Sequence, residues 1–315
     1  MDNFLITLTT VALMLAYAAP GFLVVKTKLV KEESISAFAF VLMYICQPCL
    51  VIYSFNQVDF SKSVCIEMVI AFAVIFAVIT TFIFIFFFLF KKKATLDNKY
   101  KVFTMATAFP NCAFFGIPIL ESLLPDHPEV IAFSTVYFVV MNIIGWTIGC
   151  YVITGDKKYM KVKKIVLNPA VLSLLVAIPL FIFKIKLGDG KINTFFTTFA
   201  KMTTPLCMLI MGMRLATTEI KPIFANLTQY IICIIKQCIF PLFMLLCMWF
   251  IPTDVLSIPV KQALYIMSCC PVAIIIQTYA EMLGHCQKEA VNTVLLSTIS
   301  CIITMPLMML IPIFN

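Results

Sequence analysis

Two short proline-containing segments interrupt apolar sequence and carry residue types that could bind a small ion. Pro110 and Asn111 lie in the first segment, Cys270 and Pro271 lie in the second, and the two prolines are 161 residues apart. Proline has no backbone N–H and breaks a helix, which leaves polar backbone groups unpaired. Inside a membrane such groups persist only where they are buried in protein or line a cavity. A matched pair of breaks, one in each half of the chain, predicts a transporter with a binding site near the bilayer midplane.

Lysines inside the apolar segments predict the sign of the ligand's charge. Lys236 lies nine residues inside an apolar segment, which places it about 14 Å deep, and Lys201 lies about 9 Å deep in another. Ionisable residues at such depths are hypotheses for function by default. Helices restarting at the breaks would add positive N-terminal dipole ends, with Asn111 as an N-cap and Pro271 as a first helical residue. The predicted substrate-binding residues are Pro110, Asn111, Gly116, Cys270, Pro271, Gln277, Lys201 and Lys236.

A carboxylate that gains and loses a proton during the cycle would couple transport to protons, because burial raises its pKa toward the working range. Glu67 is the first candidate, since its segment corresponds to that of Lys236 in the other half. Coupling to sodium is the alternative. The pairs Cys46/Cys49 and Cys269/Cys270 are interpreted as small apolar residues, so we predict no cofactor and no metal site.

Composition defines the elements that must position these residues. The chain has 315 residues, of which 62% are hydrophobic and only 12% are charged. This excludes an ordinary soluble domain and indicates a polytopic membrane protein. Runs of about twenty apolar residues predict ten spanning helices. They are 4–25, 35–55, 64–90, 102–124, 130–153, 165–183, 195–216, 227–251, 262–283 and 291–313.

Prolines predict that the ten helices form two related halves. Pro20, Pro48 and Pro110 align with Pro179, Pro205 and Pro271 at separations of 159, 157 and 161 residues. A five-helix unit is odd in number, so its second copy is inverted in the membrane. We therefore predict a first repeat over 1–155, a short cytoplasmic linker over 156–164 and a second, inverted repeat over 165–315, within one membrane domain. The broken helices are numbers four and nine.

Cations between the spans predict the orientation. Sixteen Lys and Arg residues fall on one side and five on the other, and the richer side is expected to face the cytoplasm. Both termini then lie outside the membrane, on the face opposite the cytoplasm. The same rule explains the net charge of +8 without a nucleic-acid partner. The short sequence patterns of proteases, hydrolases and P-loop enzymes are missing from the sequence, which argues against an enzyme.

Several short motifs resemble those of the auxin efflux carrier family, including its bacterial malate and malonate permease-like members. The resemblance extends over essentially the whole chain. It is carried by Pro110-Asn111 with Gly116-Ile117-Pro118, Asn168-Pro169, Gly212-Met213-Arg214-Leu215-Ala216 and the stretch from Pro271 to Glu281. The short lysine-rich linker between the halves is similar to that of the bacterial branch and differs from the long hydrophilic loop of the plant carriers.

This resemblance implies crossed broken helices four and nine, a scaffold of spans one, two, six and seven, and elevator-type movement of the other spans. It implies an organic anion as substrate, either a carboxylate such as malate or malonate or an auxin-like acid. It also implies a homodimer formed through the scaffold helices. The alternative function is a sodium-coupled transporter or a channel for another solute, similar to the bile-acid carriers.

Overall fold

The computed structural model is helical throughout the residues that it describes, which are 2–160, 165–188, 190–284 and 286–311. No strand occurs in these ranges, although one isolated β-bridge pairs Pro110 with Val272. Seven continuous helical segments within them are long and apolar enough to cross a membrane. They are Asp2–Lys26, Glu32–Asn56, Lys62–Leu96, Pro128–Thr154, Lys191–Thr217, Leu227–Trp249 and Gln287–Met308. The predicted all-helical membrane architecture is therefore confirmed.

Three of the ten predicted spans do not form one long helix. Span four is divided into α6 (Lys99–Ala106) and a second half that ends with α7 (Ile117–Leu123). Span nine is divided into α16 (Ile258–Cys269) and α17 (Ile275–Leu283). Span six is α11 (Pro169–Ile182), whose 14 residues cover about 21 Å of a core about 30 Å thick. Helix length thus supports seven crossings, and the predicted ten stays a prediction.

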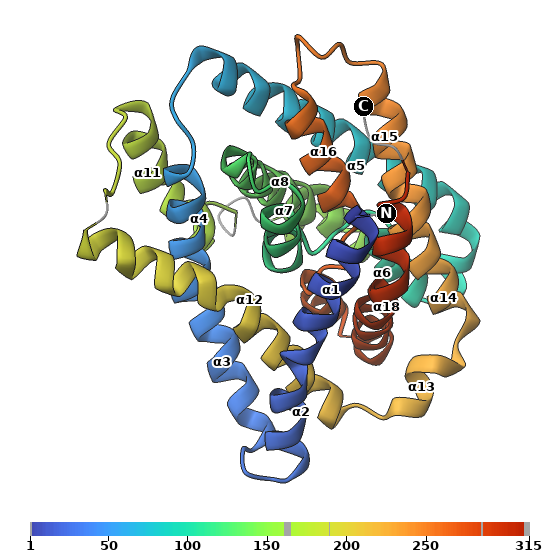
Figure 1. Cartoon of the computed structure of the whole chain (residues 1–315). Coiled ribbons are helices and arrows are strands. Elements are labelled where there is room, and N and C mark those ends of the chain that lie inside the picture. Colours follow the sequence, from blue (N-terminus) through green and yellow to red (C-terminus); the bar gives the residue numbers. More distant parts are fainter. Residues whose placement is uncertain (1, 161–164, 189, 285, 312–315) are drawn as a thin grey trace.

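The remaining elements complete the order along the chain (Figure 1). In the first half they are α1 (Asp2–Ala16), α2 (Ala18–Lys26), η1 (Glu32–Ser34), α3 (Ile35–Val41), η2 (Leu42–Cys46), α4 (Gln47–Asn56), α5 (Lys62–Leu96), η3 (Cys112–Gly116), η4 (Pro128–Val130), α8 (Ile131–Ile144), η5 (Gly145–Gly149), α9 (Cys150–Thr154) and η6 (Lys157–Tyr159). In the second half they are α12 (Lys191–Thr217), α13 (Ile220–Ala225), α14 (Leu227–Ile234), η7 (Ile235–Ile239), α15 (Phe240–Trp249) and α18 (Gln287–Met308). The segments η2, η3, η5 and η7 are π-helical turns, a local widening that is frequent at functional sites.

Local sequence sets several helix ends. The side chains of Ser61, Asn168 and Asn226 each accept a hydrogen bond from a backbone N–H two or three residues further on, and so cap α5, α11 and α14. The predicted opening of span six at Asn168-Pro169 follows this rule, with the proline in the first turn. At the other end of a helix, Gly155 and Gly284 adopt positive φ after α9 and α17.

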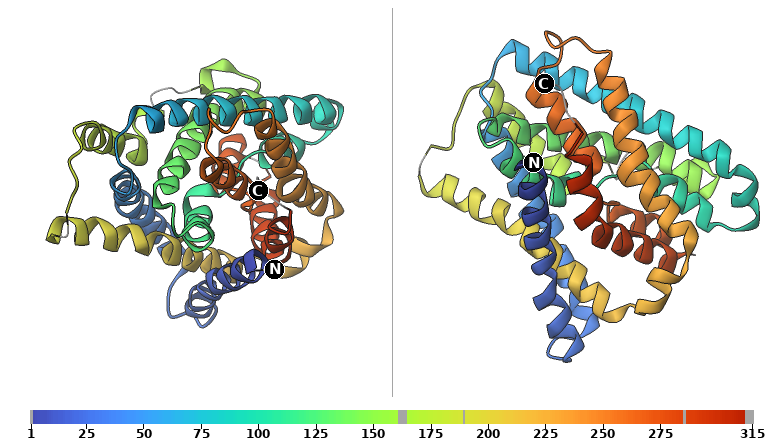
Figure 2. Two further views of the ribbon diagram at one scale, coloured as in Figure 1. Left: turned by 45° about the horizontal axis from the view of Figure 1, so that its top comes forward. Right: turned by 45° about the vertical axis from the view of Figure 1, so that its right-hand side comes forward.

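The helices form two groups. A scaffold group contains α1 to α4, α11 and α12, in which α12 packs on α2 and α4 while α11 packs on α4. A crossing group contains α5 to α9 and α14 to α18, with α8 against α5 and α18 against α14 and α17. The views in Figure 2 place α12 beside α2 and the two broken helices inside the second group. The groups meet mainly where α1 contacts α7 and α18 and where α4 contacts α8.

Glycines allow the closest contact within the scaffold group. A Cβ built on Gly212 of α12 would lie 1.9 Å from the Ala18 carbonyl oxygen, and one built on Gly21 of α2 would lie 2.0 Å from the Leu209 carbonyl oxygen. Small residues that let two backbones approach are typical of membrane helix interfaces. The α2–α12 contact therefore requires glycine at both positions.

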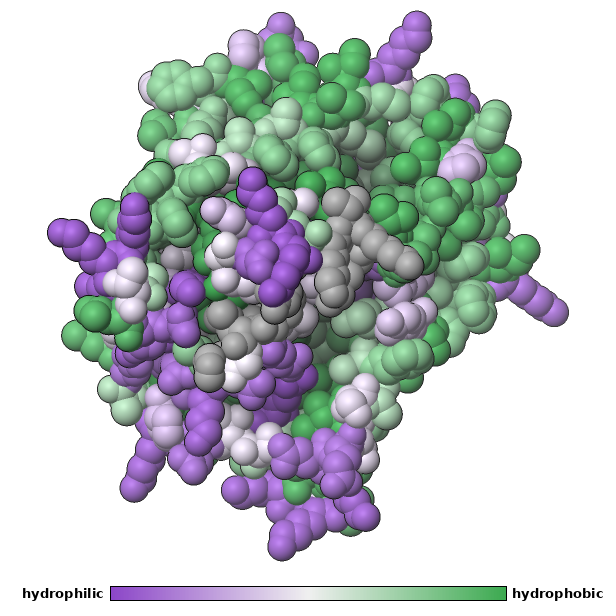
Figure 3. All heavy atoms as spheres, turned by 180° about the vertical axis from the view of Figure 1, so that it is seen from behind, coloured by the Kyte–Doolittle hydropathy of each residue, from purple (hydrophilic) through white to green (hydrophobic). Residues whose placement is uncertain are grey.

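Cavities and polar contacts distinguish the two ends of the molecule. The ends of α12, α13 and α18 line one cavity, while the ends of α5, α6 and α9 line another; these loops were predicted to share the lysine-rich side. On the other side Lys186 pairs with Asp59 at 2.9 Å, and the Ser257 hydroxyl donates to Glu67 at 2.6 Å. Lys161, Lys163 and Lys164 of the predicted linker lie outside the described residues. In Figure 3 hydrophilic residues gather at the lower and left parts of the face, and the upper and right parts are hydrophobic.

We predict that Gly212→Ala destabilises the protein, because its methyl group collides with a backbone that cannot rotate away. Overpacking costs about 1–3 kcal/mol and more where the backbone must shift. Thermal unfolding of the purified protein in detergent should show a lowered melting temperature. Gly190→Ala is the matched control, since nothing lies within 4 Å of its Cβ position. Equal melting temperatures for both variants would contradict the close α2–α12 contact.

Candidate functional site

The two broken helices cross and bond to each other through their backbones. The Asn111 N–H donates to the Pro271 carbonyl at 2.8 Å, and the Ala273 N–H donates to the Phe109 carbonyl at 2.9 Å. This antiparallel bridge satisfies polar groups that the helix breaks would otherwise leave unpaired in an apolar interior. The breaks predicted from Pro110 and Pro271 are thus in direct contact, although the sequence placed them in separate halves.

Side chains from α18 and η7 form hydrogen bonds at and near the second break. The Val272 N–H donates to the Ser297 hydroxyl at 3.0 Å, and that hydroxyl donates to Val294 O. Gln237 donates to Ser297 O at 2.6 Å and accepts from the Ser300 hydroxyl at 2.8 Å. Sequence analysis missed Ser297 and Gln237, because neither lies in a break and their partners are about 25 to 60 residues away in sequence.

The Lys236 ammonium lies at the end of the half-helix α16. It is fully buried and donates to the carbonyls of Ser268 at 2.7 Å and Cys270 at 3.1 Å. It also lies 4.8 Å from the centroid of the Phe240 ring. A cation is favourable at a helix C-terminus, where carbonyls lack intrahelical partners. None of the ion pairs formed by the described residues includes Lys236, so backbone carbonyls and a ring stabilise its charge.

The second half-helix restarts later than the sequence suggested, whereas the first restarts directly after Asn111. Pro271 was predicted to be a first helical residue, but α17 begins at Ile275, four residues beyond it. Asn111 does occupy the N-cap position of η3, but its side chain makes no capping hydrogen bond. That side chain lies instead within reach of the Cys207 thiol of α12. Pro271 does not start a helix because its carbonyl and the neighbouring Val272 pair with the first break.

Gly116 and Cys270 lie where the halves of the two helices touch. A Cβ on Gly116 would be 3.4 Å from the Cys270 sulfur and 3.4 Å from Met267 Cγ. Cys270 is fully buried, and its thiol donates to Ile266 O. These two predicted site residues therefore lie together at the crossing.

Two buried polar side chains in this region have no hydrogen-bond partner among the described residues. They are the amide of Gln277 on α17, which is 4% exposed, and the hydroxyl of Tyr137 on α8, which is 0% exposed. An unpaired buried polar group costs about 1–3 kcal/mol. Such groups are candidates for contacts that form in another conformation or with a ligand. Gln277 was among the predicted binding residues, whereas Tyr137 was not.

Lys201 lines a cavity of about 330 Å³ between the scaffold group and the second half of span four. We call it the outer cavity; its polar lining includes Thr10, Tyr53, Glu121, Ser122, Lys201 and Thr204. The Tyr53 hydroxyl donates to Glu121 at 3.4 Å, and the Thr204 hydroxyl donates to Phe114 O at 2.9 Å. Lys201 therefore lies apart from Lys236, so the two predicted cations do not share one site.

Glu67 lies near the start of α5, on the side of the molecule opposite the lysine-rich loops. It accepts hydrogen bonds from the hydroxyl and the backbone N–H of Ser257, in the loop before α16. Glu67 does not line the outer cavity, whereas Glu121 does. The carboxylate next to Lys201 is consequently a different one from the residue that the sequence favoured.

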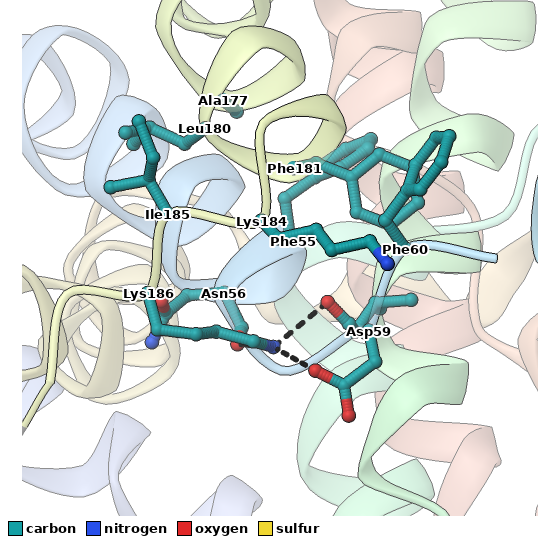
Figure 4. A pocket seen from close by; sticks show the side chains of 11 residues that line it. Phe55, Asn56, Asp59, Phe60, Ala177, Leu180, Phe181, Lys184, Ile185 and Lys186 are labelled. Carbon is teal, nitrogen blue, oxygen red and sulfur yellow. Dashed lines mark hydrogen bonds and ion pairs between the residues drawn. The ribbon is translucent and has the colours of Figure 1, made fainter.

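A smaller pocket of about 240 Å³ lies between the loops after α4 and α11 (Figure 4). Lys186 donates to the carbonyls of Asn56 and Val58 and pairs with Asp59 at 2.9 Å. The ring of Phe181 packs edge-on against Phe55 and Phe60. Lys186 thus connects the loop after α11 to the loop after α4, where the pocket lies.

Comparison with known proteins assigns the chain to a family. The family described as "Membrane transport protein" matches the chain over residues 6–165 and again over 158–309. A search of curated proteins finds no match. The two family matches together cover nearly the whole chain, and they confirm the resemblance that the motifs predicted.

We predict that Ser297→Ala destabilises the second break, because Val272 N–H loses its acceptor inside an apolar core. The cost should be about 1–3 kcal/mol, measured as a fall in the melting temperature. Thr298→Val is the control, since the Thr298 hydroxyl bonds only to Val294 O within its own helix. If the two variants unfold at the same temperature, Ser297 does not support the break.

Proposed function

The chain belongs to the membrane transport protein family, which is the family of the auxin efflux carriers, and on that basis we propose that it is a secondary transporter of a small organic anion. The crossing of the two broken helices carries this proposal. Discontinuous helices that meet inside the membrane are how many secondary transporters build their substrate sites. The chain is a multi-pass membrane protein, as its seven long apolar helices indicate.

An anion is favoured by the charges around the crossing. Lys236 adds one buried positive charge there, and Lys201 adds a second in the outer cavity. The Asn111 side chain lies toward α12, on the side of the crossing that the scaffold group covers. Because the two breaks bond to each other directly, we place the substrate beside the crossing, in the outer cavity, with Lys201 as its nearest cation. Malate, malonate or an auxin-like acid would suit a cavity of about 330 Å³.

We propose ten membrane crossings arranged as two inverted five-helix repeats, over 1–155 and 165–315. Two observations support this: the family match divides near residue 160, and each half contributes one broken helix to the crossing. The crossing group would move against the scaffold group as an elevator. Fewer pairs of helices are in contact between the two groups than within each group. Such a boundary suits relative movement.

A proton-carrying carboxylate should be reachable from the substrate cavity. Glu121 meets this condition, since it lines the outer cavity and its only described hydrogen bond is the 3.4 Å contact from Tyr53. Glu67, the residue favoured by the sequence, is instead bound by Ser257 outside that cavity. We therefore propose Glu121 ahead of Glu67 for proton coupling, with sodium coupling as the alternative.

The same proposal includes the orientation in the membrane and the oligomeric state. Both termini would lie outside a bacterial cytoplasmic membrane, with the lysine-rich loops in the cytoplasm. A homodimer would form through the scaffold, where α11 exposes large apolar residues. Those residues include Leu172, Leu175, Val176, Ile178 and Ile182.

We predict saturable counterflow of labelled malonate or malate into proteoliposomes containing the purified protein. Lys201→Met should raise the half-saturating concentration about tenfold, equivalent to about 1.4 kcal/mol of lost binding. Lys191→Met is the matched control, because Lys191 is exposed at the start of the same helix and lines none of the cavities described above.

Flux that does not saturate and shows no counterflow would support a channel instead. Dependence on a sodium gradient would support the bile-acid-carrier-like alternative, and dependence on a pH gradient that disappears in Glu121→Gln would support proton coupling. If intact protein moves neither acid, the small dicarboxylates are excluded, and a larger aromatic acid is the next substrate to test.

A further inference from the structure

A second cavity, of about 390 Å³, opens at the end of the molecule where the lysine-rich loops lie. We call it the inner cavity; its lining includes Glu32, Arg214, Glu219, Lys288 and Asn292. Arg214 comes from the last turns of α12, in the scaffold group, whereas Asn292 comes from the second turn of α18, in the crossing group. The inner cavity therefore lies between the two groups, as the outer cavity does.

Two polar atoms that belong to residues lining this cavity are buried and lack hydrogen-bond partners among the described residues. They are Nε of Arg214 and Oδ1 of Asn292, and the Asn292 residue is 6% exposed. The first is a charged donor and the second is an acceptor. Unpaired buried groups of this kind are candidates for contacts that form with a ligand or in another conformation, and together they suit a ligand that carries both an anionic acceptor and a donor.

The other charged residues of the cavity lie at its rim. Glu32, Glu219 and Lys288 are exposed, and water and salt weaken their fields. None of the ion pairs found among the described residues includes Arg214, so neither acid neutralises it through direct contact. A guanidinium is well suited to a carboxylate, because its planar N–H groups match the two oxygens.

We propose that the inner cavity is a second carboxylate-binding site, in which Arg214 binds the carboxylate and the Asn292 carbonyl accepts from a hydroxyl or protonated acid group of the same ligand. This inference rests on the proposed transport of small organic acids and adds the site where the substrate loads or leaves on the lysine-rich side. A ligand bound there contacts both helix groups, so its binding depends on their relative position.

Binding of malonate and of malate to the purified protein, measured by calorimetric titration in detergent, tests this site; malate should bind more tightly, because only malate has a hydroxyl that can donate to Asn292. We expect Arg214→Gln to weaken binding about tenfold, and Asn292→Asp to weaken it at least as much, because it places a negative charge in the cavity. Arg214→Lys should retain part of the affinity. Lys221→Gln is the matched control, since Lys221 is an exposed cation on the adjacent α13 that does not line the cavity. Malonamide, which is uncharged, should not bind.

Wild-type protein that fails to bind malonate would overturn the inference, as would unchanged affinity in both Arg214→Gln and Asn292→Asp. An equal loss in Lys221→Gln would also overturn it, because the effect would then be one of general charge. Melting temperatures of all variants identify any that do not fold, and the isosteric Asn292→Asp change keeps the test available if Arg214→Gln is one of them. Counterflow is measured in parallel: normal wild-type counterflow with unchanged binding in the variants refutes only the inner site, whereas no counterflow refutes the proposed function.

Discussion

The two helix breaks pair through their backbones inside an apolar interior. Asn111 and Ala273 donate to the carbonyls of Pro271 and Phe109, so each break supplies the partners that the other lacks. In an interior without water, neither break could exist alone at acceptable free energy. The two halves of the chain must therefore assemble around each other. Ser297 and Gln237 then hold the second break from α18 and η7.

Electrostatics at the crossing follow from the same geometry. Ending α16 inside the membrane leaves carbonyls without partners, and the Lys236 ammonium binds two of them. Removing a charge from water is costly, and close hydrogen-bonding partners offset much of that cost. The lysine and the helix end thus stabilise each other. The net effect is a positive charge fixed beside the helix crossing, in a protein whose substrate we propose to be an anion.

The interfaces differ in how freely they can move. Close backbone contact at Gly21 and Gly212 holds α2 tightly against α12, within the scaffold group. Between the groups, by contrast, the structure has two cavities of about 330 and 390 Å³ and isolated polar contacts such as that from Thr204 to Phe114 O. The boundary between the groups is therefore less continuously packed than the α2–α12 contact.

The class of the protein, its family and the positions of both breaks could be predicted from the sequence, because hydrophobicity, proline and lysine act locally and leave their pattern in the chain. The sequence also identified Gly116, Cys270 and Lys236, which the structure gathers at the crossing. The sequence predicted a helix start at Pro271, where the structure has none. It also did not show that Lys201 lies apart from both Lys236 and Glu67. Three features required the folded structure: the breaks pair with each other, Lys236 binds carbonyls, and Arg214 and Asn292 line the same cavity. The physical reason is that each of these contacts joins groups 30 or more residues apart in the chain, and only the packing of whole helices brings them together.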